Sequence, residues 1–336
     1  MKKDINKKVI IGFSIGDYNG IGPEILLKSF SSTDLLDYCI PIIFCDKQIL
    51  DFYAEKFRIN IKIKKIKNLN QSLESDCLNT FSENNETLKI TPGYMDKIAG
   101  IYAINSLNKS SEALINKNID SIVTLPICKI NSQNKTFSFP GHTEYFLSKF
   151  NIDSNIMIMC SDIMKIGFIT GHIPINSLLD HLNNKYLEKK LNIFLESIQQ
   201  DFKIDNPRIA ILGLNPHAGE EGLIGNEEKI LIQPIIDKLN KKKEIFYGPF
   251  SSDSFFGLKK FKDFDGIISW YHDQGLVGFK SFCFDNGVNF TGGLPYVRTS
   301  PDHGTAFNIA GKGIASEKSL IESIKLNIKI INNRKF

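Results

Sequence analysis

Three histidines stand where apolar segments of the sequence end. They are His172, His217 and His272, and the segments that precede them are 165–170, 209–214 and 266–270. Because the carboxyl ends of parallel strands meet at one edge of a sheet, we expect the three imidazoles to converge. Three imidazoles with open coordination positions are typical of a catalytic metal site, and imidazole favours Zn, Co or Ni over Mg. The alternative is three unrelated polar side chains at strand ends.

The glycine-rich stretch Ser269–Gly313 carries further cationic and polar groups, namely Lys280, Asn289 and Arg298. We expect this stretch to form loops at the end of the sheet, because its glycine density is unfavourable for a long helix. A guanidinium binds phosphate or carboxylate through two parallel hydrogen bonds, so Arg298 predicts a small anionic substrate. Equally, Arg298 could form an ion pair with Asp302 or Asp285.

Other polar residues lie at predicted helix starts and turns. His142 follows Pro-Gly and precedes Thr143, so both belong at a helix entrance that could bind a phosphate or carboxylate. Spacing alone favours a plainer interpretation, a helix cap with an exposed histidine. Asp253, in GPFSSDSFF, is a candidate carboxylate for proton transfer or for orienting a ligand.

The first glycine loop follows a predicted strand at residues 8–14 and leads into Pro23 and Glu24, a helix-start pattern. The spacing of its glycines at 16, 20 and 22 does not match the G-x-G-x-x-G dinucleotide pattern. A structural turn and an anion-binding loop are both compatible with this sequence.

The elements that must position these residues alternate between strands and helices along the chain. Further strands are predicted at 40–45, 59–66, 119–125 and 156–159, helices at 46–57, 96–116 and 186–200, and a loop or hairpin at 71–87. This alternation predicts an α/β protein with a largely parallel sheet.

Composition narrows the class of protein. The chain has 336 residues, 42% of them hydrophobic, which is enough for two lobes. A net charge of +4 argues against a nucleic-acid partner, and no apolar run reaches the roughly 18 residues that span a membrane. The six cysteines include no Cys-x-x-Cys pair and no signal peptide is evident, so we expect reduced thiols in a cytoplasmic protein.

The longest motifs resemble those of the 4-hydroxythreonine-4-phosphate dehydrogenase family of vitamin B6 synthesis. They are GDYNGIGPE, FPGHTEYF, GLNPHAGEEGLIGNEE, GPFSSDSFF, WYHDQGLVGFK and VNFTGGLPYVRTSPDHGTAFNIAGKG. The resemblance implies a two-lobed α/β fold like that of isocitrate and isopropylmalate dehydrogenases, with a central cleft. It implies a cofactor-side lobe of residues 1–130 with 300–336, a metal-side lobe of residues 131–299, and a homodimer.

The resemblance also implies roles for individual residues. The metal ligands match His172, His217 and His272, and the metal would be Zn, or else Co or Mg. Substrate contacts match His142, Thr143, Lys280, Asn289 and Arg298, and the catalytic groups match Lys280 and Asp253, the latter from the partner subunit. DHGTAFNIAGKG is similar to a stretch of the isopropylmalate enzymes that meets the adenine of the nicotinamide cofactor, which nominates His303 and Gly304 for NAD or NADP.

Two segments depart from the family pattern. The usual E-P-A-G-I-G-P loop reads Asp17-Tyr-Asn-Gly-Ile-Gly-Pro, and the usual G-P-[VI]-[HN]-K reads Leu-Pro-Ile-Cys128-Lys129. Both keep the glycines, proline or lysine that the geometry requires, but they bear on substrate preference.

The activity implied is NAD(P)-dependent oxidative decarboxylation of 4-phosphooxy-L-threonine to 3-amino-2-oxopropyl phosphate and CO₂. One alternative keeps the fold and takes 4-phospho-D-threonate as substrate. From the residues alone, a zinc hydrolase with three histidine ligands and no nicotinamide is a further alternative. A non-catalytic phosphate-binding relative is disfavoured because every proposed catalytic position is occupied.

Overall fold

The computed structural model describes residues 8–83, 87–133, 137, 139 and 141–335. They divide into two compact units, the first comprising the described residues up to Tyr145 together with Tyr296–Asn332. The second comprises Phe146–Pro295 and the described residues from Asn333 onward. The sequence predicted boundaries near 130 and 299, which assigned His142, Thr143 and Arg298 to the second lobe, whereas in the structure they belong to the first unit. Within the described residues, no helix combines the length and apolar character needed to cross a membrane.

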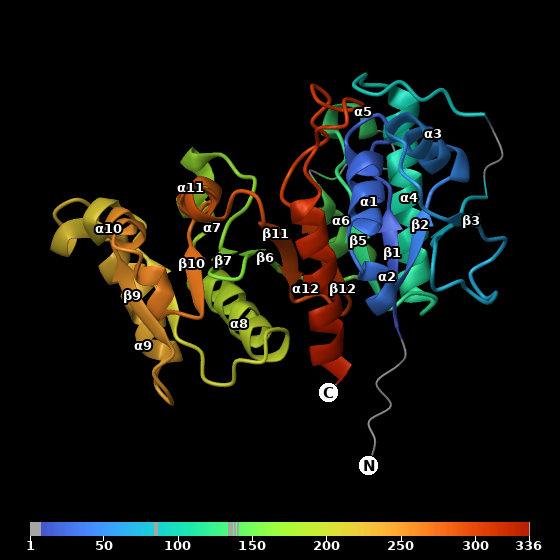
Figure 1. Cartoon of the computed structure of the whole chain (residues 1–336). Coiled ribbons are helices and arrows are strands. Elements are labelled where there is room, and N and C mark those ends of the chain that lie inside the picture. Colours follow the sequence, from blue (N-terminus) through green and yellow to red (C-terminus); the bar gives the residue numbers. More distant parts are fainter. Residues whose placement is uncertain (1–7, 84–86, 134–136, 138, 140, 336) are drawn as a thin grey trace, which may run out of the picture. The chain divides into compact units, whose positions relative to one another are not determined.

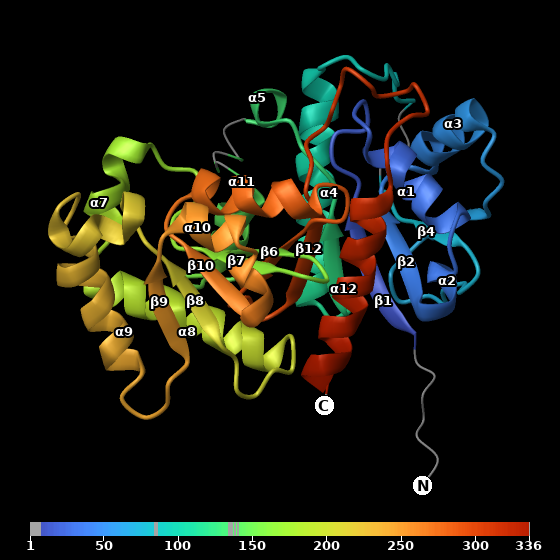
Figure 2. The ribbon, with the colours of Figure 1, turned by 60° about the vertical axis from the view of Figure 1, so that its left-hand side comes forward.

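The first unit is built on strands in the order β3-β4-β2-β1-β5-β12, all parallel in their recorded pairings. Its elements are β1 (Val9–Ser14), α1 (Gly22–Ser31), α2 (Leu35–Tyr38), β2 (Cys39–Phe44), α3 (Lys47–Phe57), β3 (Ile63–Lys65), β4 (Leu78–Thr80), α4 (Lys97–Ile115), β5 (Ser121–Thr124), α5 (Lys129–Ser132), the start of α6 (His142–Lys149), β12 (Val297–Pro301) and most of α12 (Lys318–Lys335). Helices α1 and α12 lie side by side in Figure 1 and Figure 2, and α4 packs across β1, β2 and β5.

The second unit is built on strands in the order β11-β6-β7-β10-β8-β9. Its elements are β6 (Ile156–Cys160), β7 (Lys165–Phe168), η1 (Ile175–Ser177), α7 (Leu178–His181), α8 (Asn184–Gln200), β8 (Ile209–Leu212), η2 (Pro216–Gly222), η3 (Glu228–Ile232), α9 (Gln233–Leu239), β9 (Phe246–Phe250), α10 (Ser252–Gly257), η4 (Lys260–Asp263), β10 (Gly266–Ser269), α11 (His272–Cys283) and β11 (Val288–Gly292). Strand β6 runs antiparallel to both β11 and β7, whereas β7, β10, β8 and β9 are mutually parallel.

Close approach of helices to this second sheet depends on glycines at two strand positions. A Cβ on Gly167 or Gly266 would lie 2.6–2.7 Å from the ring of Phe194, a residue of α8. Because these glycines have no side chain, α8 packs closely on that face of the sheet. The neighbouring side chain, Phe168, points to the opposite face because side chains alternate along a strand. There it packs near α11, since a Cβ on Gly275 would lie 2.6 Å from Phe168 Cε1.

Most predicted elements are confirmed, including the helix of α3, whose start is capped by the Asp46 carboxylate accepting from the Gln48 amide. The prediction of a loop or hairpin at 71–87 is wrong where β4 joins β2 and β3. Its polar Asn79 is buried because its carboxamide donates to the carbonyls of Pro41 (3.2 Å) and Glu74 (2.9 Å). The polar side chain that suggested a surface loop therefore forms its hydrogen bonds inside the sheet.

The prediction that Ser269–Gly313 forms loops at the end of the sheet is also wrong for much of the stretch. Residues His272–Cys283 form α11, and β11 and β12 follow within the same stretch. Gly275 and Gly278 sit on the buried side of α11, where a Cβ would lie 2.6 Å from Ser269 Oγ and 2.5 Å from the Phe256 ring, respectively. These glycines serve close packing of the helix rather than turns of the chain.

Candidate active site

The ends of β7 and β10 are joined by hydrogen bonds that align two histidines. The Thr170 amide (3.2 Å) and hydroxyl (2.6 Å) both donate to the carbonyl of Trp270. His172 and His272 each follow one of these residues by the same interval, and their rings lie 5.3 Å apart between centroids. The structure thus brings together two of the three predicted metal ligands at the carboxyl edge of the sheet.

Gln274, in the first turn of α11, ties the end of β10 to the end of β8. Its Oε1 accepts from the Trp270 amide (2.7 Å), and its Nε2 donates to the Gly213 carbonyl (2.6 Å) and the Ser252 hydroxyl (3.0 Å). The side chain of Gln274 therefore links three segments that carry candidate site residues. They are the segments of His272, His217 and Asp253.

His217 lies in a segment with unusual backbone conformation. From His217 to Glu221 every φ is positive, with values of 53°, 51°, 80°, 43° and 53°. Only glycine adopts this left-handed region without penalty, and each other residue costs roughly 1–2 kcal/mol there. Such strain persists only where the surroundings enforce it, and it clusters at functional sites.

The donor chemistry of the three imidazoles suits a transition metal. His272 Nδ1 lies 2.7 Å from Asp273 Oδ1, which leaves Nε2 for a ligand and resembles the carboxylate–histidine pairs behind many metal ligands. The three histidines do not form a group whose ligand atoms all lie within 4.8 Å of one another. In donor chemistry the three imidazoles fit a metal, but the structure brings only His172 and His272 together, and His217 would have to join them to complete the set.

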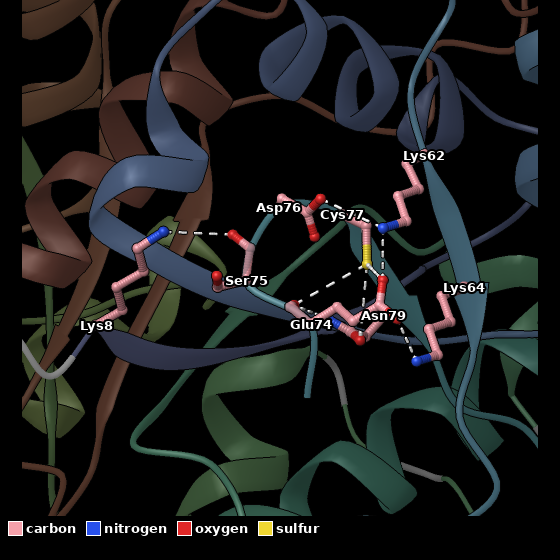
Figure 3. Close-up of polar contacts among 8 residues, drawn as sticks. All are labelled: Lys8, Lys62, Lys64, Glu74, Ser75, Asp76, Cys77 and Asn79. Atoms are coloured by element: carbon pink, nitrogen blue, oxygen red, sulfur yellow. Dashed lines mark hydrogen bonds and ion pairs between the residues drawn. The ribbon is translucent and has the colours of Figure 1, made fainter. Parts of the chain in front are cut away.

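One group among the described residues does meet that distance, and it lies in the first unit: Glu74, Asp76 and Cys77. Figure 3 shows that Lys62 and Lys64 point at it, with Lys62 Nζ 2.7 Å from Glu74 and 3.3 Å from Asp76. Their hydrogen bonds lower the pKa of Glu74 to about 2, while burial raises the pKa of Cys77 to about 11. Lysine ammonium groups already neutralise this acidic cluster, and its thiol stays protonated, so it is a poor metal site.

In the first unit, Arg298 forms the base of a candidate anion site. It lies on β12 opposite Ile122, is only 2% exposed, and donates from Nε (3.1 Å) and Nη2 (2.7 Å) to the Thr124 hydroxyl. Burial lowers the pKa of the guanidinium to about 9, and the charge of Glu144 acts in the opposite direction. A bound anion would stabilise a guanidinium that burial disfavours.

His142 begins α6 as predicted, and it belongs to the same region as Arg298. Its Nε2 is buried and has no hydrogen-bond partner among the described residues. Burial, followed by the charges of Arg298 and Lys129, lowers the pKa of His142 well below its ordinary value. A neutral imidazole beside two cations can donate a hydrogen bond to an anionic ligand, and Thr143 follows it in the first turn of α6.

The candidate cofactor residues His303 and Gly304 follow β12, next to the first glycine loop. The Ile21 amide donates to the carbonyl of Thr305 (3.0 Å), and a Cβ on Gly20 would lie 2.9 Å from that oxygen. The loop itself is held by Asp17, whose carboxylate accepts from Asn131 Nδ2 (2.7 Å) and from the amide of Asn19 (3.0 Å). Burial raises the pKa of Asp17, one of three residues at which this loop departs from the usual E-P-A-G-I-G-P.

The remaining predicted residues lie in the second unit. Asp253 is exposed at the start of α10; its pKa is lowered chiefly by the Ser251 hydroxyl, with a smaller contribution from the charge of His217 in the same chain. Lys280 lies on α11 beyond His272, and Asn289 lies on β11, opposite Met159 of β6. The Asn289 Oδ1 is buried without a hydrogen-bond partner among the described residues, as expected of a ligand-binding carboxamide.

Sequence reasoning missed the residues that hold the site. Thr124 bonds Arg298 directly, whereas Gln274 and Glu228 bond residues that lie near His272, His217 and Asp253 in the sequence. Thr124 and Gln274 had a usable signal, because each is a polar residue at or just after a predicted strand end. Glu228 ends the quoted motif GLNPHAGEEGLIGNEE, but the residue types of that polar motif do not indicate which of its glutamates is buried.

Comparison with known proteins matches the sequence to one family. Residues 37–327 match the family described as "Pyridoxal phosphate biosynthetic protein PdxA". A 4-hydroxythreonine-4-phosphate dehydrogenase of Bacteroides thetaiotaomicron is 39% identical over 328 residues, which cover 97% of this chain and 90% of that protein. An Oceanobacillus iheyensis protein provisionally named a D-threonate 4-phosphate dehydrogenase is 32% identical, over 97% of this chain and 99% of that protein.

The fold is shared with solved structures of the same name. The crystal structure of a Klebsiella pneumoniae 4-hydroxythreonine-4-phosphate dehydrogenase has a TM-score of 0.83 and 29% identity, and the match covers 98% of this chain and 99% of that one. A Salmonella typhimurium structure has a TM-score of 0.82 at 29% identity, covering 96% and 100%. The predicted isocitrate/isopropylmalate-dehydrogenase-like α/β fold is thereby confirmed.

Proposed function

This chain belongs to the PdxA family of pyridoxal phosphate biosynthetic proteins and is a nicotinamide-dependent dehydrogenase, and from that premise we propose the reaction and the residues that carry it. The reaction is NAD(P)-dependent oxidation of 4-phosphooxy-L-threonine, followed by loss of CO₂ to give 3-amino-2-oxopropyl phosphate. Family membership removes the support for a zinc hydrolase, which the residues alone permitted.

The observation that carries the proposal is the buried guanidinium of Arg298 beside the neutral imidazole of His142. Arg298 would bind the anionic group of the substrate in two parallel hydrogen bonds, held in place by Thr124. His142 and Thr143 would donate to the same group. A substrate that carries both phosphate and carboxylate suits a site with this much positive charge.

The oxidation would require a hydroxyl that loses its proton while C3 loses a hydride to the nicotinamide. A divalent metal held by His172, His217 and His272 would lower the pKa of that hydroxyl, as metals do for bound water. Zn is the best match for imidazole ligands, with Co or Mg as alternatives. Asp253 would accept or relay the proton, since hydrogen bonds keep its pKa low and its carboxylate ionised.

The decarboxylation breaks the bond between the carboxylate carbon and the carbon that bears the amino group. The electron pair moves to the new carbonyl as an enolate, which Lys280 would stabilise electrostatically before a proton completes the product. Asn289 would orient the substrate through its buried carboxamide oxygen. His303 and Gly304 would meet the adenine of NAD or NADP.

We also propose that the working molecule is a cytoplasmic homodimer with Asp253 entering the partner's site. The second unit exposes several large apolar side chains that a partner subunit would cover. They are Leu223 (84%), Ile230 (71%), Leu258 (70%), Val277 (67%) and Phe284 (73%). All six cysteines are free, five of them buried, which supports a reducing compartment.

The competing substrate is 4-phospho-D-threonate, because relatives provisionally named for it are 32% identical to this chain. The two substrates differ at the carbon beside the carboxylate, so side-by-side turnover distinguishes them. The test is nicotinamide absorbance with each compound and with both NAD and NADP. Faster turnover of the D-threonate compound would reassign the substrate while leaving the reaction type in place.

A further inference from the structure

Glu228 is a buried carboxylate that contacts the segment carrying His217. It is 4% exposed and opens the π-helical turn η3, a rare element that often marks functional sites. Its Oε1 accepts from the amides of Leu214 (2.8 Å) and Asn215 (2.7 Å), and its Oε2 accepts from Asn215 Nδ2 (2.9 Å). One carboxylate therefore receives three hydrogen bonds from the residues that precede His217.

The same carboxylate also packs against the middle of the left-handed segment. A Cβ on Gly219 would lie 2.6 Å from Glu228 Oε2 and 2.6 Å from the Gly225 carbonyl. Gly219 has a φ of 80°, so both its conformation and its contact with Glu228 require the absence of a side chain. Glu228 thus contacts the start and the centre of the segment that carries His217.

Strand pairing ends just before this point. The Gly213 amide still donates across the sheet, to the Phe250 carbonyl at 2.7 Å. The next two amides, those of Leu214 and Asn215, donate to the Glu228 carboxylate instead. Bonds within the segment, such as Ala218 to the Asn215 carbonyl (3.1 Å), are local and do not orient it on the sheet. Glu228 therefore makes most of the hydrogen bonds that hold the start of the segment beyond β8; Glu227 adds one to Asn215 Nδ2 (2.7 Å), and Gln274 adds one to the Gly213 carbonyl (2.6 Å).

We propose that Glu228 is a positioning residue that holds the His217 imidazole in place for the metal, an inference that rests on the proposed function of His217 as a ligand. The carboxylate acts through backbone amides rather than by touching the metal or the substrate. A carboxylate is needed because both oxygens accept hydrogen bonds, and charge-assisted bonds are stronger than neutral ones. A glutamine would present an amide donor to the donor group of Asn215 and lose part of this arrangement.

The test compares Glu228→Gln with a matched control, Glu221→Gln, in the full chain. Both changes remove one negative charge from the same region, but the Glu221 side chain is 96% exposed and pairs only with the surface Lys229 among the recorded ion pairs (3.2 Å). Each protein is stripped with chelator and titrated with Co²⁺, and binding and the visible ligand-field spectrum are recorded. Hydrogen exchange at Leu214 and Asn215, together with the melting temperature, reports on the segment without any metal.

We expect Glu228→Gln to weaken Co²⁺ binding about 10- to 100-fold, the usual effect of removing a group behind a metal ligand. Exchange at Leu214 and Asn215 should accelerate, and the Co²⁺ spectrum should change, while Glu221→Gln matches the parent in all three. Parental Co²⁺ affinity in Glu228→Gln would overturn the inference, and so would a lower melting temperature with unchanged affinity. If the parent itself binds no Co²⁺ through its histidines, the proposed function of those histidines fails instead.

Discussion

The imidazole rings of His172 and His272 lie 5.3 Å apart, although the two residues come from different strands of the sheet. Their proximity follows from the parallel pairing of β7 with β10 and from the Thr170 hydroxyl, which donates to the Trp270 carbonyl. Two side chains thus reach the same position at the sheet edge because the strands that carry them end in register. The predictions below depend on what this edge and the buried Arg298 bind.

Replacement of a single metal ligand should abolish turnover. We expect His272→Ala and His217→Ala each to lose tight binding of Zn²⁺ or Co²⁺ and to fall to background activity, because each removes one of three ligands. Metal content and circular dichroism of the purified variants check the loss and the fold. His181→Ala is the control, since its exposed ring bonds only the Ser177 carbonyl among its recorded hydrogen bonds. Parental turnover by either ligand variant would refute the triad.

Arg298→Lys should impair use of the substrate. A lysine cannot reproduce the two parallel hydrogen bonds of a guanidinium, and losing such a contact costs about 1.5–3 kcal/mol, or roughly one to two decades in kcat/KM. Arg334→Lys is the matched control, because Arg334 bonds Asp201 (2.6 Å) and the Leu294 carbonyl (3.1 Å) and has no proposed substrate role. The control should lower the melting temperature with near-normal kinetics; the same pattern in Arg298→Lys would mean that Arg298 is structural.

The lowered pKa of His142 predicts how stability depends on pH. The unfolded chain has a histidine pKa of about 6.5 and binds a proton on this ring at pH values where the folded protein does not. The contribution of His142 to stability is therefore full above about pH 6.5 and declines as pH falls below it, by at most about 1.4 kcal/mol per pH unit. Melting temperatures between pH 7.5 and 5 should fall more steeply in the parent than in His142→Asn. Parallel curves would show that this imidazole titrates normally.

Composite active sites should allow complementation between inactive subunits. If Asp253 acts in the partner's site, a heterodimer of Asp253→Asn and His272→Ala contains one site with both native residues. Mixed subunits, separated by affinity tags, should recover up to about half of the parental activity per dimer, by this count of sites. Asp253 also senses the charge of His217 in its own chain, so a site built from one chain is the competing arrangement. Verified heterodimers without activity would support that arrangement.

The sequence allowed the order of strands and helices to be predicted where apolar periodicity was strong. It also predicted the meeting of His172 with His272, because parallel strands with equal leads into their loops end together. Prediction from the sequence failed where tertiary packing outweighed the intrinsic secondary-structure propensity of the residues. Helix α11 contains Gly275 and Gly278, which disfavour helix in isolation but remove the side chains that would collide with Phe168 and Phe256.

Other features of the site depend on contacts between residues far apart in the sequence. The left-handed segment at His217 is unfavourable locally, and the residues that lead into it bond to the Glu228 carboxylate. The low pKa of Arg298 comes from complete burial on β12, which its polar, turn-rich sequence context did not suggest. No pattern of residue types along the chain reports burial of this kind.

The most direct test of the proposed reaction is nicotinamide absorbance with purified protein, NAD or NADP, and 4-phosphooxy-L-threonine, run with and without chelator. The account predicts formation of reduced nicotinamide together with an equal amount of CO₂, loss of both when metal is removed, and recovery when Zn²⁺ or Co²⁺ is restored. Phosphate release without reduced nicotinamide, or undiminished turnover by chelator-treated protein shown to be free of metal, would contradict it.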